Sequence, residues 1–148
     1  MPQVEASVVI KGNTAEVYAL AKDMESYPQF MEDVVSIKVM ERSPGRTLTD
    51  WNARLQGKPM RWQEEDLFDD ARPHIRYRQI SGDLKKFEGD WFFDAAGEGT
   101  RVTLTVDFEL GIPMFAAMLN PVAKLVVKNN IESMLKGMKV KVEGSKAG

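Results

Sequence analysis

Several polar side chains fall at positions that the surrounding apolar pattern assigns to the inside of the protein. They are Glu64, Asp66, Tyr77, Gln79 and Asn130. Such groups can hydrogen-bond to a ligand, and a buried glutamate can also hold or move a proton. An ionised carboxylate is costly to bury unpaired, so Glu64 must be neutralised, paired with an arginine, hydrated by a cavity or turned outward by a β-bulge. The sequence leaves these alternatives open.

The chain lacks the residue spacings of most recognisable catalytic sites. It has no cysteine and a single histidine, His74, which follows Pro73 and is expected at the surface. No glycine-rich phosphate loop, nucleophile elbow or metal-ligand spacing is present, so we expect neither a metal nor a cofactor. With 20 basic and 22 acidic residues, the net charge of −2 provides no overall field for nucleic acid, which is therefore not an expected partner.

Aromatic residues are concentrated at positions predicted to face inward. They are Trp51, Trp62, Phe68, Tyr77, Phe87, Trp91, Phe93 and Phe108. Inward-facing tryptophans suit a flat or hydrophobic ligand, but tryptophan is also common in ordinary hydrophobic cores. The methionines Met114, Met118, Met134 and Met138 lie on or near the predicted C-terminal helix, where they can fill the core or adapt to an irregular ligand. Both alternatives remain open.

Alternating apolar and polar residues predict seven strands joined mostly by short turns. These strands cover residues 4–10, 34–42, 47–55, 60–68, 75–80, 87–93 and 102–108. In the second strand, Val35, Ile37 and Val39 are expected to share one face. Two short helices are expected after the first strand, one beginning near Asn13 and one over residues 26–31. The short turns between the later strands indicate antiparallel pairing.

A long amphipathic helix is predicted from Pro113 to Val142. Its apolar face carries Leu119, Ala123, Val127, Ile131, Met134 and Met138, and lysines line the opposite face. Asn130 interrupts the apolar face, either as an amide bonded to backbone or as a polar group facing a ligand. This helix is the one large element able to cover an antiparallel sheet, which predicts an α+β fold with a curved sheet gripping a helix.

Length and composition predict one domain, residues 1–148, with a hydrophobic fraction of 43%. The chain shows neither a signal-peptide pattern nor an apolar run long enough to span a membrane, so we expect a soluble, cytoplasmic protein without stable membrane insertion. We expect a monomer or weak dimer.

Four arginines are expected on the outer face of the sheet, where Glu65 or Glu88 can pair with them: Arg54, Arg61, Arg76 and Arg78. Residues after Val142 are expected to fray.

Several short sequence segments resemble those of the polyketide cyclase/dehydrase and START-like (SRPBCC) superfamily of helix-grip proteins. They are Val17 and Tyr18 after Gly12 and Asn13; Ser26 to Phe30; Met60 to Asp66; Gly82 and Asp83; and Phe87 to Phe93. The coenzyme-Q-binding START-like and aromatase/cyclase branches are the nearest in pattern, and the birch-pollen-allergen fold is more distant. The resemblance implies a helix-grip (START-like) fold with an internal hydrophobic cavity and the long helix as one wall.

The resemblance implies two main functions. The first is binding of a small hydrophobic ligand, such as a lipid, a quinone or a polycyclic aromatic molecule. The expected ligand-binding residues are Trp51, Trp62, Glu64, Tyr77, Trp91, Phe108, Asn130 and Met134. The alternative is an aromatase/cyclase-like enzyme for aldol cyclisation and dehydration of a polyketide, in which Tyr77 and Asn130 orient carbonyl oxygens and Glu64 moves a proton. A protein-interaction role, as in relatives acting on chaperones or ribosomes, is a third possibility.

Overall fold

The computed structural model describes residues 3–109 and 120–147. In chain order the elements are β1 (Gln3–Ile10), α1 (Thr14–Lys22), the short 3-10 helix η1 (Met24–Gln29), β2 (Val34–Ser43), β3 (Arg46–Leu55), β4 (Lys58–Asp69), β5 (His74–Gly82), β6 (Lys86–Ala96), β7 (Gly99–Glu109) and α2 (Asn120–Ala147). Asn13 caps α1, because its side chain accepts a hydrogen bond from the Glu16 backbone N–H.

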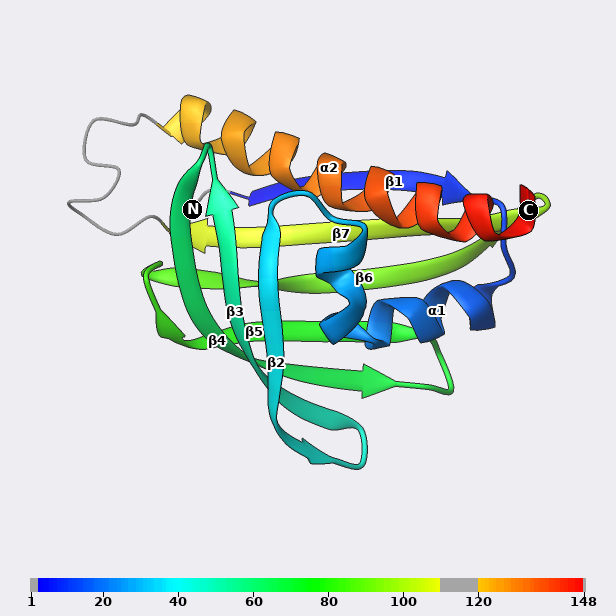
Figure 1. Ribbon diagram of the computed structural model, residues 1–148, viewed down its shortest axis with the longest axis horizontal. Helices are drawn as coiled ribbons and strands as arrows, with labels where there is room; N and C mark the ends of the chain where they lie inside the picture. The colour runs from blue at the N-terminus through cyan, green and yellow to red at the C-terminus, as the bar shows by residue number, and fades with distance from the viewer. Residues whose placement is uncertain (1–2, 110–119, 148) are drawn as a thin grey trace.

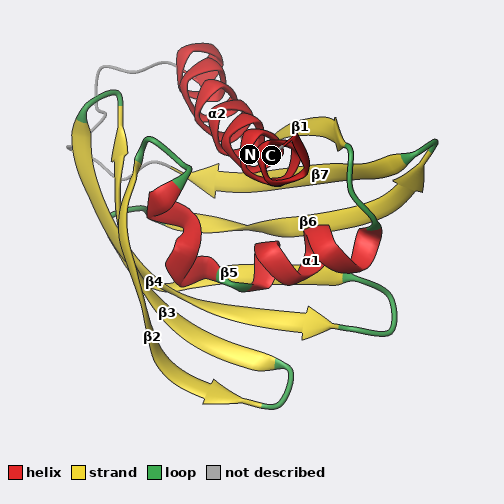
Figure 2. Cartoon of the chain, turned by 45° about the vertical axis from the view of Figure 1, so that its right-hand side comes forward, coloured by secondary structure: helices red, strands yellow, loops and turns green. Residues whose placement is uncertain are grey.

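The strands form one antiparallel sheet in the order β1-β7-β6-β5-β4-β3-β2. Consecutive strands are neighbours except β1 and β2, which lie at opposite edges and are connected through α1 and η1. Figures 1 and 2 show the sheet curving around these two short helices, with α2 lying along β1 and closing the open side. The predicted α+β class, with seven strands and a long C-terminal helix, is confirmed.

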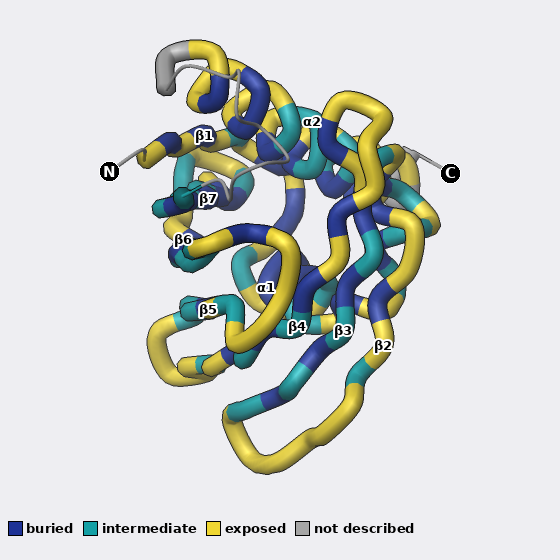
Figure 3. Tube along the Cα trace, turned by 90° about the vertical axis from the view of Figure 1, so that its left-hand side faces the viewer, coloured by how far each residue is buried: buried dark blue, intermediate teal, exposed yellow. Residues whose placement is uncertain are grey.

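Alternation along the strands decides which side chains lie inside. On β7, Val102, Leu104, Val106 and Phe108 are buried, and the residues between them remain at least partly exposed. Figure 3 shows the same alternation of buried and more exposed positions along β3 and β4. The predicted inner face is therefore confirmed for these strands.

The predicted inner face of β2 is wrong at one residue. Val35 is exposed, and its neighbour Val34 is buried instead. The pairing of β2 with β3 shifts register between Val34 and Ser36, which inserts an extra residue and reverses the alternation at that point. A bulge of this kind depends on the partner strand.

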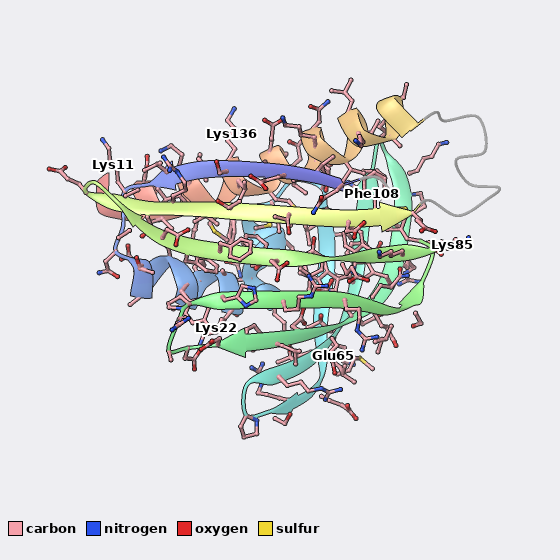
Figure 4. The ribbon with its side chains drawn as sticks, turned by 180° about the vertical axis from the view of Figure 1, so that it is seen from behind. Lys11, Lys22, Glu65, Lys85, Phe108 and Lys136 are labelled. Carbon is pink, nitrogen blue, oxygen red and sulfur yellow. The ribbon has the colours of Figure 1, made fainter. Side chains whose placement is uncertain are left out.

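Charged side chains cover the outer face of the sheet, which Figure 4 shows with Glu65 labelled. Arg76 reaches Glu88 at 2.6 Å, and Arg78 reaches Glu65 at 3.3 Å, so the predicted cross-strand pairing is confirmed for these two of the four arginines. His74 is partly exposed, and its Nε2 lies 2.8 Å from Asp90. Partly exposed pairs of this kind contribute little to stability individually.

Helix α2 differs from the prediction at both ends. Its described part begins at Asn120, so the predicted start at Pro113, together with Met114, Met118 and Leu119, lies outside the described residues. At the other end the helix continues to Ala147, and the predicted fraying after Val142 is wrong. The side chain of Glu143 holds this end by accepting hydrogen bonds from the Lys11 backbone N–H and from Lys139.

Gly137 lets α2 approach the chain after η1 very closely. A Cβ atom at this position would lie 2.1 Å from the backbone oxygen of Phe30 and 3.5 Å from Cα of Met31. Atoms cannot come this close without backbone movement, so any larger residue would push the helix away from the core.

Gly137→Ala is expected to destabilise the fold by about 1–3 kcal/mol, although alanine normally favours a helix. Gly144 in the same helix is the matched control, because a Cβ there meets nothing within 4 Å. Gly144→Ala should stabilise the protein by up to about 1 kcal/mol. Urea unfolding of both variants measures this contrast, and two effects of the same sign would contradict the close approach.

Candidate ligand-binding site

A cavity lies between the inner face of the sheet and α2. Its walls come from strands β2 to β7, from α2 and from the segments just before β2 and β6. It offers about 60 Å³ to the centres of water molecules, which is room for a few of them. Arg54 is exposed and Asp33, Phe87, Asn130 and Met134 are partly exposed, so these residues mark the mouth. Of the four arginines predicted on the outer face, Arg54 is thus the one beside the cavity.

The structure brings all the predicted ligand-binding residues to this cavity. Trp51, Trp62, Glu64, Tyr77, Trp91, Phe108, Asn130 and Met134 line it. Whether any of them binds a ligand remains a prediction. The remaining lining residues, which the sequence did not single out as binding residues, are mostly apolar: Asp33, Val34, Ala53, Arg54, Leu55, Met60, Leu84, Phe87, Leu104, Val106, Val127 and Ile131.

Aromatic rings make up much of one wall. Trp51 and Trp62 face each other across β3 and β4, with ring centroids 5.2 Å apart and planes 17° from parallel. Phe87 on β6 packs edge-on against Trp62 at 5.2 Å and against Tyr77 at 5.6 Å. The rings hold one another in place, which presents a preformed apolar surface.

Two carboxyl groups lie buried behind this aromatic wall. Glu64 is 2% exposed and lines the cavity. Asp66, the next residue on the same face of β4, is fully buried. Trp62 donates its indole N–H to Oε1 of Glu64 at 2.8 Å. Asp66 Oδ2 accepts hydrogen bonds from the hydroxyls of Thr47, at 3.0 Å, and Thr49, at 2.7 Å.

Burial is the main cause that raises the pKa of Glu64 well above its ordinary value. The nearby Asp66 carboxylate raises the pKa of Glu64 further, against the opposing effect of the hydrogen bond from Trp62. Burial also raises the pKa of Asp66, while the neighbouring Glu64 carboxyl and the hydrogen bonds from Thr49 and Thr47 oppose that change. We conclude that Glu64 is protonated in the folded protein. Of the alternatives for this buried carboxyl, neutralisation therefore fits best.

Neither a cationic partner nor an outward turn accounts for Glu64 within the described residues. No arginine, lysine or histidine among them forms a salt bridge with Glu64. The ladder between β4 and β5 does shift register between Gln63 and Glu64, but Glu64 stays on the inner face. Glu64 is therefore a neutral carboxyl group at the wall of the cavity.

The hydrogen-bond donors to Asp66 could have been found from the hairpin between β3 and β4. Its turn consists of Gln56 and Gly57, both with positive φ, and pairs Leu55 with Lys58. Counting back from that turn places Thr49 opposite Glu64 and Thr47 opposite Asp66. Sequence reasoning recognised the carboxyls but missed these two threonines, because it did not count the register.

Tyr77 is held in place by its hydroxyl, which donates to the backbone oxygen of Thr105 at 2.6 Å. This hydrogen bond passes over Gly89. A Cβ atom at that position would lie 1.9 Å from the Thr105 oxygen and 2.6 Å from the Tyr77 hydroxyl, so a larger residue would block the bond. Because its proton is used in this bond, the hydroxyl oxygen can only accept a hydrogen bond from a ligand. Burial raises the pKa of Tyr77 well above its ordinary value, so the phenol stays neutral.

Asn130 projects from α2 at the mouth and is partly exposed. Its side-chain amide makes no hydrogen bond with another described residue. Of the two alternatives for this residue, the position beside the cavity therefore fits better than an amide tied to backbone. Of the candidates for catalysis, Glu64 and Tyr77 lie on the sheet wall and Asn130 on the helix wall.

Within residues 3–109 and 120–147, no three acidic or histidine side chains gather in a way that could hold a metal ion. Among the same residues, no helix combines the length and apolarity needed to cross a membrane. The polar side chains that line the cavity are Glu64, Tyr77 and Asn130, with Asp33 and Arg54 at the mouth.

The proton on Glu64 predicts a pH dependence of stability. Above the ordinary glutamate pKa of 4.5 the folded protein keeps a proton that the unfolded chain loses, so its contribution to the free energy of unfolding falls as pH rises. Glu64→Gln removes this contribution, and the variant should gain stability relative to the original protein between about pH 5 and pH 8.

Chemical unfolding at several pH values measures this difference. Glu65→Gln is the control, because hydrogen bonding to Arg46 lowers the pKa of Glu65, which is then ionised throughout that range. If Glu64→Gln and Glu65→Gln changed stability in parallel with pH, Glu64 would not be protonated in the folded protein.

Solved structures provide the first comparison with known proteins. TTHA0849 from Thermus thermophilus is 38% identical, with a TM-score of 0.91 over 97% of this chain and 99% of that chain. A START superfamily protein from Mycobacterium smegmatis is 19% identical, with a TM-score of 0.86 over 97% of this chain and 99% of that one. The predicted helix-grip (START-like) fold is therefore confirmed.

Curated relatives and a family model provide the second comparison. The ribosome association toxin RatA of Escherichia coli K12 is 22% identical over 134 residues, which is 90% of this chain and 84% of RatA. The actinorhodin polyketide synthase bifunctional cyclase/dehydratase of Streptomyces coelicolor is 31% identical over 94 residues, 62% of this chain and 30% of that protein. Residues 10–135 match the model of the polyketide cyclase/dehydrase and lipid transport family, to which this chain therefore belongs.

Proposed function

We propose that this protein binds a small hydrophobic molecule in the cavity between its sheet and α2. The observation that carries the proposal is the cavity itself, an apolar and aromatic space at the position where the fold joins sheet and helix. All three tryptophans of the chain lie on its wall. The description of the family includes lipid transport, which agrees with a cavity of this character.

Binding requires the cavity to enlarge. Pockets for drug-sized ligands typically measure roughly 300 Å³ or more, which exceeds the present volume. The side chains at the mouth can provide the space, since Met134 and Phe87 are partly exposed and a methionine side chain adapts readily to new shapes. A flexible apolar chain or a flat ring system would enter between them.

Binding of such a ligand can be tested by native mass spectrometry of the purified protein and by titration with quinones, fatty acids and polycyclic phenols. Because Trp51, Trp62 and Trp91 all line the cavity, a bound ligand should change tryptophan fluorescence. A protein that retains no ligand and shows no fluorescence change with any of these classes would contradict the proposal.

Asn130→Phe is expected to weaken ligand binding roughly tenfold or more, because the larger ring overpacks the mouth. The neighbouring Asn129 is exposed and does not line the cavity, so Asn129→Phe is a matched control in the same helix. Its affinity should stay within about twofold of the original. Equal losses in both variants would mean that the ligand binds elsewhere.

A second candidate function is cyclisation and dehydration of a polyketide. Two observations favour it: the similarity to the actinorhodin cyclase/dehydratase, and a protonated Glu64 beside the cavity. Glu64 would give its proton to the developing or leaving hydroxyl and take back the proton that the neighbouring substrate carbon loses, while Asn130 positions a carbonyl group.

If this second function holds, the protein should accelerate formation of an aromatic product from a linear poly-β-ketone surrogate. Glu64→Gln should then lower the rate about a hundredfold, since general acid–base groups contribute on that scale. Product formation is followed by its ultraviolet absorbance. An unchanged rate in the variant would remove Glu64 from the reaction, and no acceleration by the original protein would remove the function.

A further inference from the structure

The three tryptophans on the cavity wall differ in whether their indole N–H groups are already used. Trp51 donates its N–H to the hydroxyl of Thr49 at 2.9 Å, and Trp62 donates to Glu64 at 2.8 Å. The N–H of Trp91 has no hydrogen-bond acceptor among the residues that the structure describes. An indole nitrogen can donate but not accept a hydrogen bond. Trp91 therefore brings an unused donor to the wall of the cavity.

The indole nitrogen of Trp91 borders open space, although the residue as a whole is only 3% exposed. In the described part of the chain, the side-chain atoms that the protein encloses without a partner are Oδ1 of Asp66, Oε1 of Gln79 and Oδ1 of Asp107. The indole nitrogen of Trp91 is not one of them. The open space that this residue lines is the cavity between the sheet and α2, so its N–H is presented to a molecule inside the cavity.

Aliphatic and aromatic side chains hold the ring of Trp91 in place. Trp91 is paired with Ile75 on β5 and with Leu104 on β7, and both neighbours are buried. Its ring stacks on Phe93, with centroids 6.4 Å apart and planes 5° from parallel, and its centroid lies 6.1 Å from that of the Tyr27 ring. A ring packed on these sides keeps its N–H in one direction, which prepares the donor for a ligand.

A fixed, unused N–H in an apolar wall distinguishes between kinds of ligand. In the free protein, water that enters the cavity can accept this hydrogen bond. A hydrocarbon ligand that displaces the water leaves the N–H unpaired, whereas a ligand with an oxygen acceptor replaces the lost bond. A carboxylate would have to give up the hydration of its charge in an apolar space. A hydroxyl oxygen can accept the bond, but its own proton then lies among the hydrocarbon side chains around Trp91.

We propose that Trp91 positions the ligand of this cavity by donating its indole N–H to a carbonyl oxygen, so that the ligand is a ketone, a quinone or an ester. A carbonyl oxygen supplies the acceptor that the indole lacks and brings no proton that needs a partner of its own. This assignment rests on the proposed function, because it names the ligand class of the same cavity and the residue that selects it.

Two-dimensional nitrogen–proton NMR of the complete chain observes this bond directly, because each tryptophan gives one indole N–H signal. Two probes of the same shape differ in one group: acetophenone carries a carbonyl oxygen, and α-methylstyrene carries a methylene group in its place. Acetophenone should move the Trp91 proton signal downfield, as a new hydrogen bond does, and α-methylstyrene should not. The signals of Trp51 and Trp62 are internal controls, since their N–H groups already have acceptors in the protein.

Dissociation constants from the same titrations measure the preference for a carbonyl. The third probe, 1-phenylethanol, has the same skeleton as acetophenone and similar hydrophobicity but carries a hydroxyl. Acetophenone should bind roughly three- to tenfold more tightly than this alcohol, as expected for a hydrogen bond formed without leaving a ligand proton unpaired.

Two variants assign the preference to one indole. Trp91→Phe keeps an aromatic ring but removes the N–H, so the ratio of acetophenone to α-methylstyrene dissociation constants should rise roughly three- to tenfold. Binding of α-methylstyrene by this variant shows that the cavity persists. Trp51→Phe is the matched control, because it replaces an indole of the same wall whose N–H is occupied by Thr49. Both affinities can change in this control, but their ratio should stay within about twofold of the original.

The outcomes separate this assignment from the function on which it rests. Equal effects of acetophenone and α-methylstyrene on the Trp91 signal would overturn it, and so would an unchanged ratio in Trp91→Phe or an equal rise in both variants. Binding of 1-phenylethanol as tight as that of acetophenone, or tighter, would overturn the carbonyl class. In each of these cases the probes bind, and the proposed binding function stands. Failure of every probe to bind, together with no ligand retained by the purified protein, would overturn the proposed function and the role of Trp91 with it.

Discussion

The buried carboxyl pair on β4 is the constraint on which the rest of the cavity depends. Glu64 and Asp66 both face inward, and two carboxyls so close together in an apolar interior cannot both be ionised without a large cost. The fold meets this cost with one proton and with three donors from Trp62, Thr47 and Thr49. The two threonines are in place because the register of the β3–β4 hairpin aligns them with the acids, and Trp62 lies on the same face of β4 as Glu64.

The same hairpin forms the aromatic wall, since Trp51 and Trp62 are paired in the register that also aligns Thr49 with Glu64. Polar and apolar parts of the cavity are therefore built by one pair of strands. Helix α2 closes the opposite side, and the close approach at Gly137 fixes how near it lies to the segment after η1. Between these two rigid parts, the mouth around Met134 and Asn130 is the part of the wall most open to solvent and to rearrangement.

Membership in the polyketide cyclase/dehydrase and lipid transport family narrows the function to a few classes, because one fold serves several tasks in it. The chemistry of the wall distinguishes those tasks better than the fold does. A protonated carboxyl beside an apolar cavity can either hydrogen-bond to a bound ligand or transfer its proton to a substrate. Both uses place the ligand against Glu64, and they differ in whether that proton stays with the acid pair.

The sequence by itself determined the seven strands, the long amphipathic helix and which residues of β3, β4 and β7 face inward, because a period of two in side-chain direction is a local property. It therefore identified eight of the residues that line the cavity. Tertiary structure decided the charge of Glu64, because its protonation depends on burial by distant segments of the chain and on the buried Asp66 beside it. It also decided the exposure of Val35, through a bulge against β3, and the persistence of α2 beyond Val142, through the contact of Glu143 with Lys11. Each of these depends on contacts between distant segments, which local alternation does not encode.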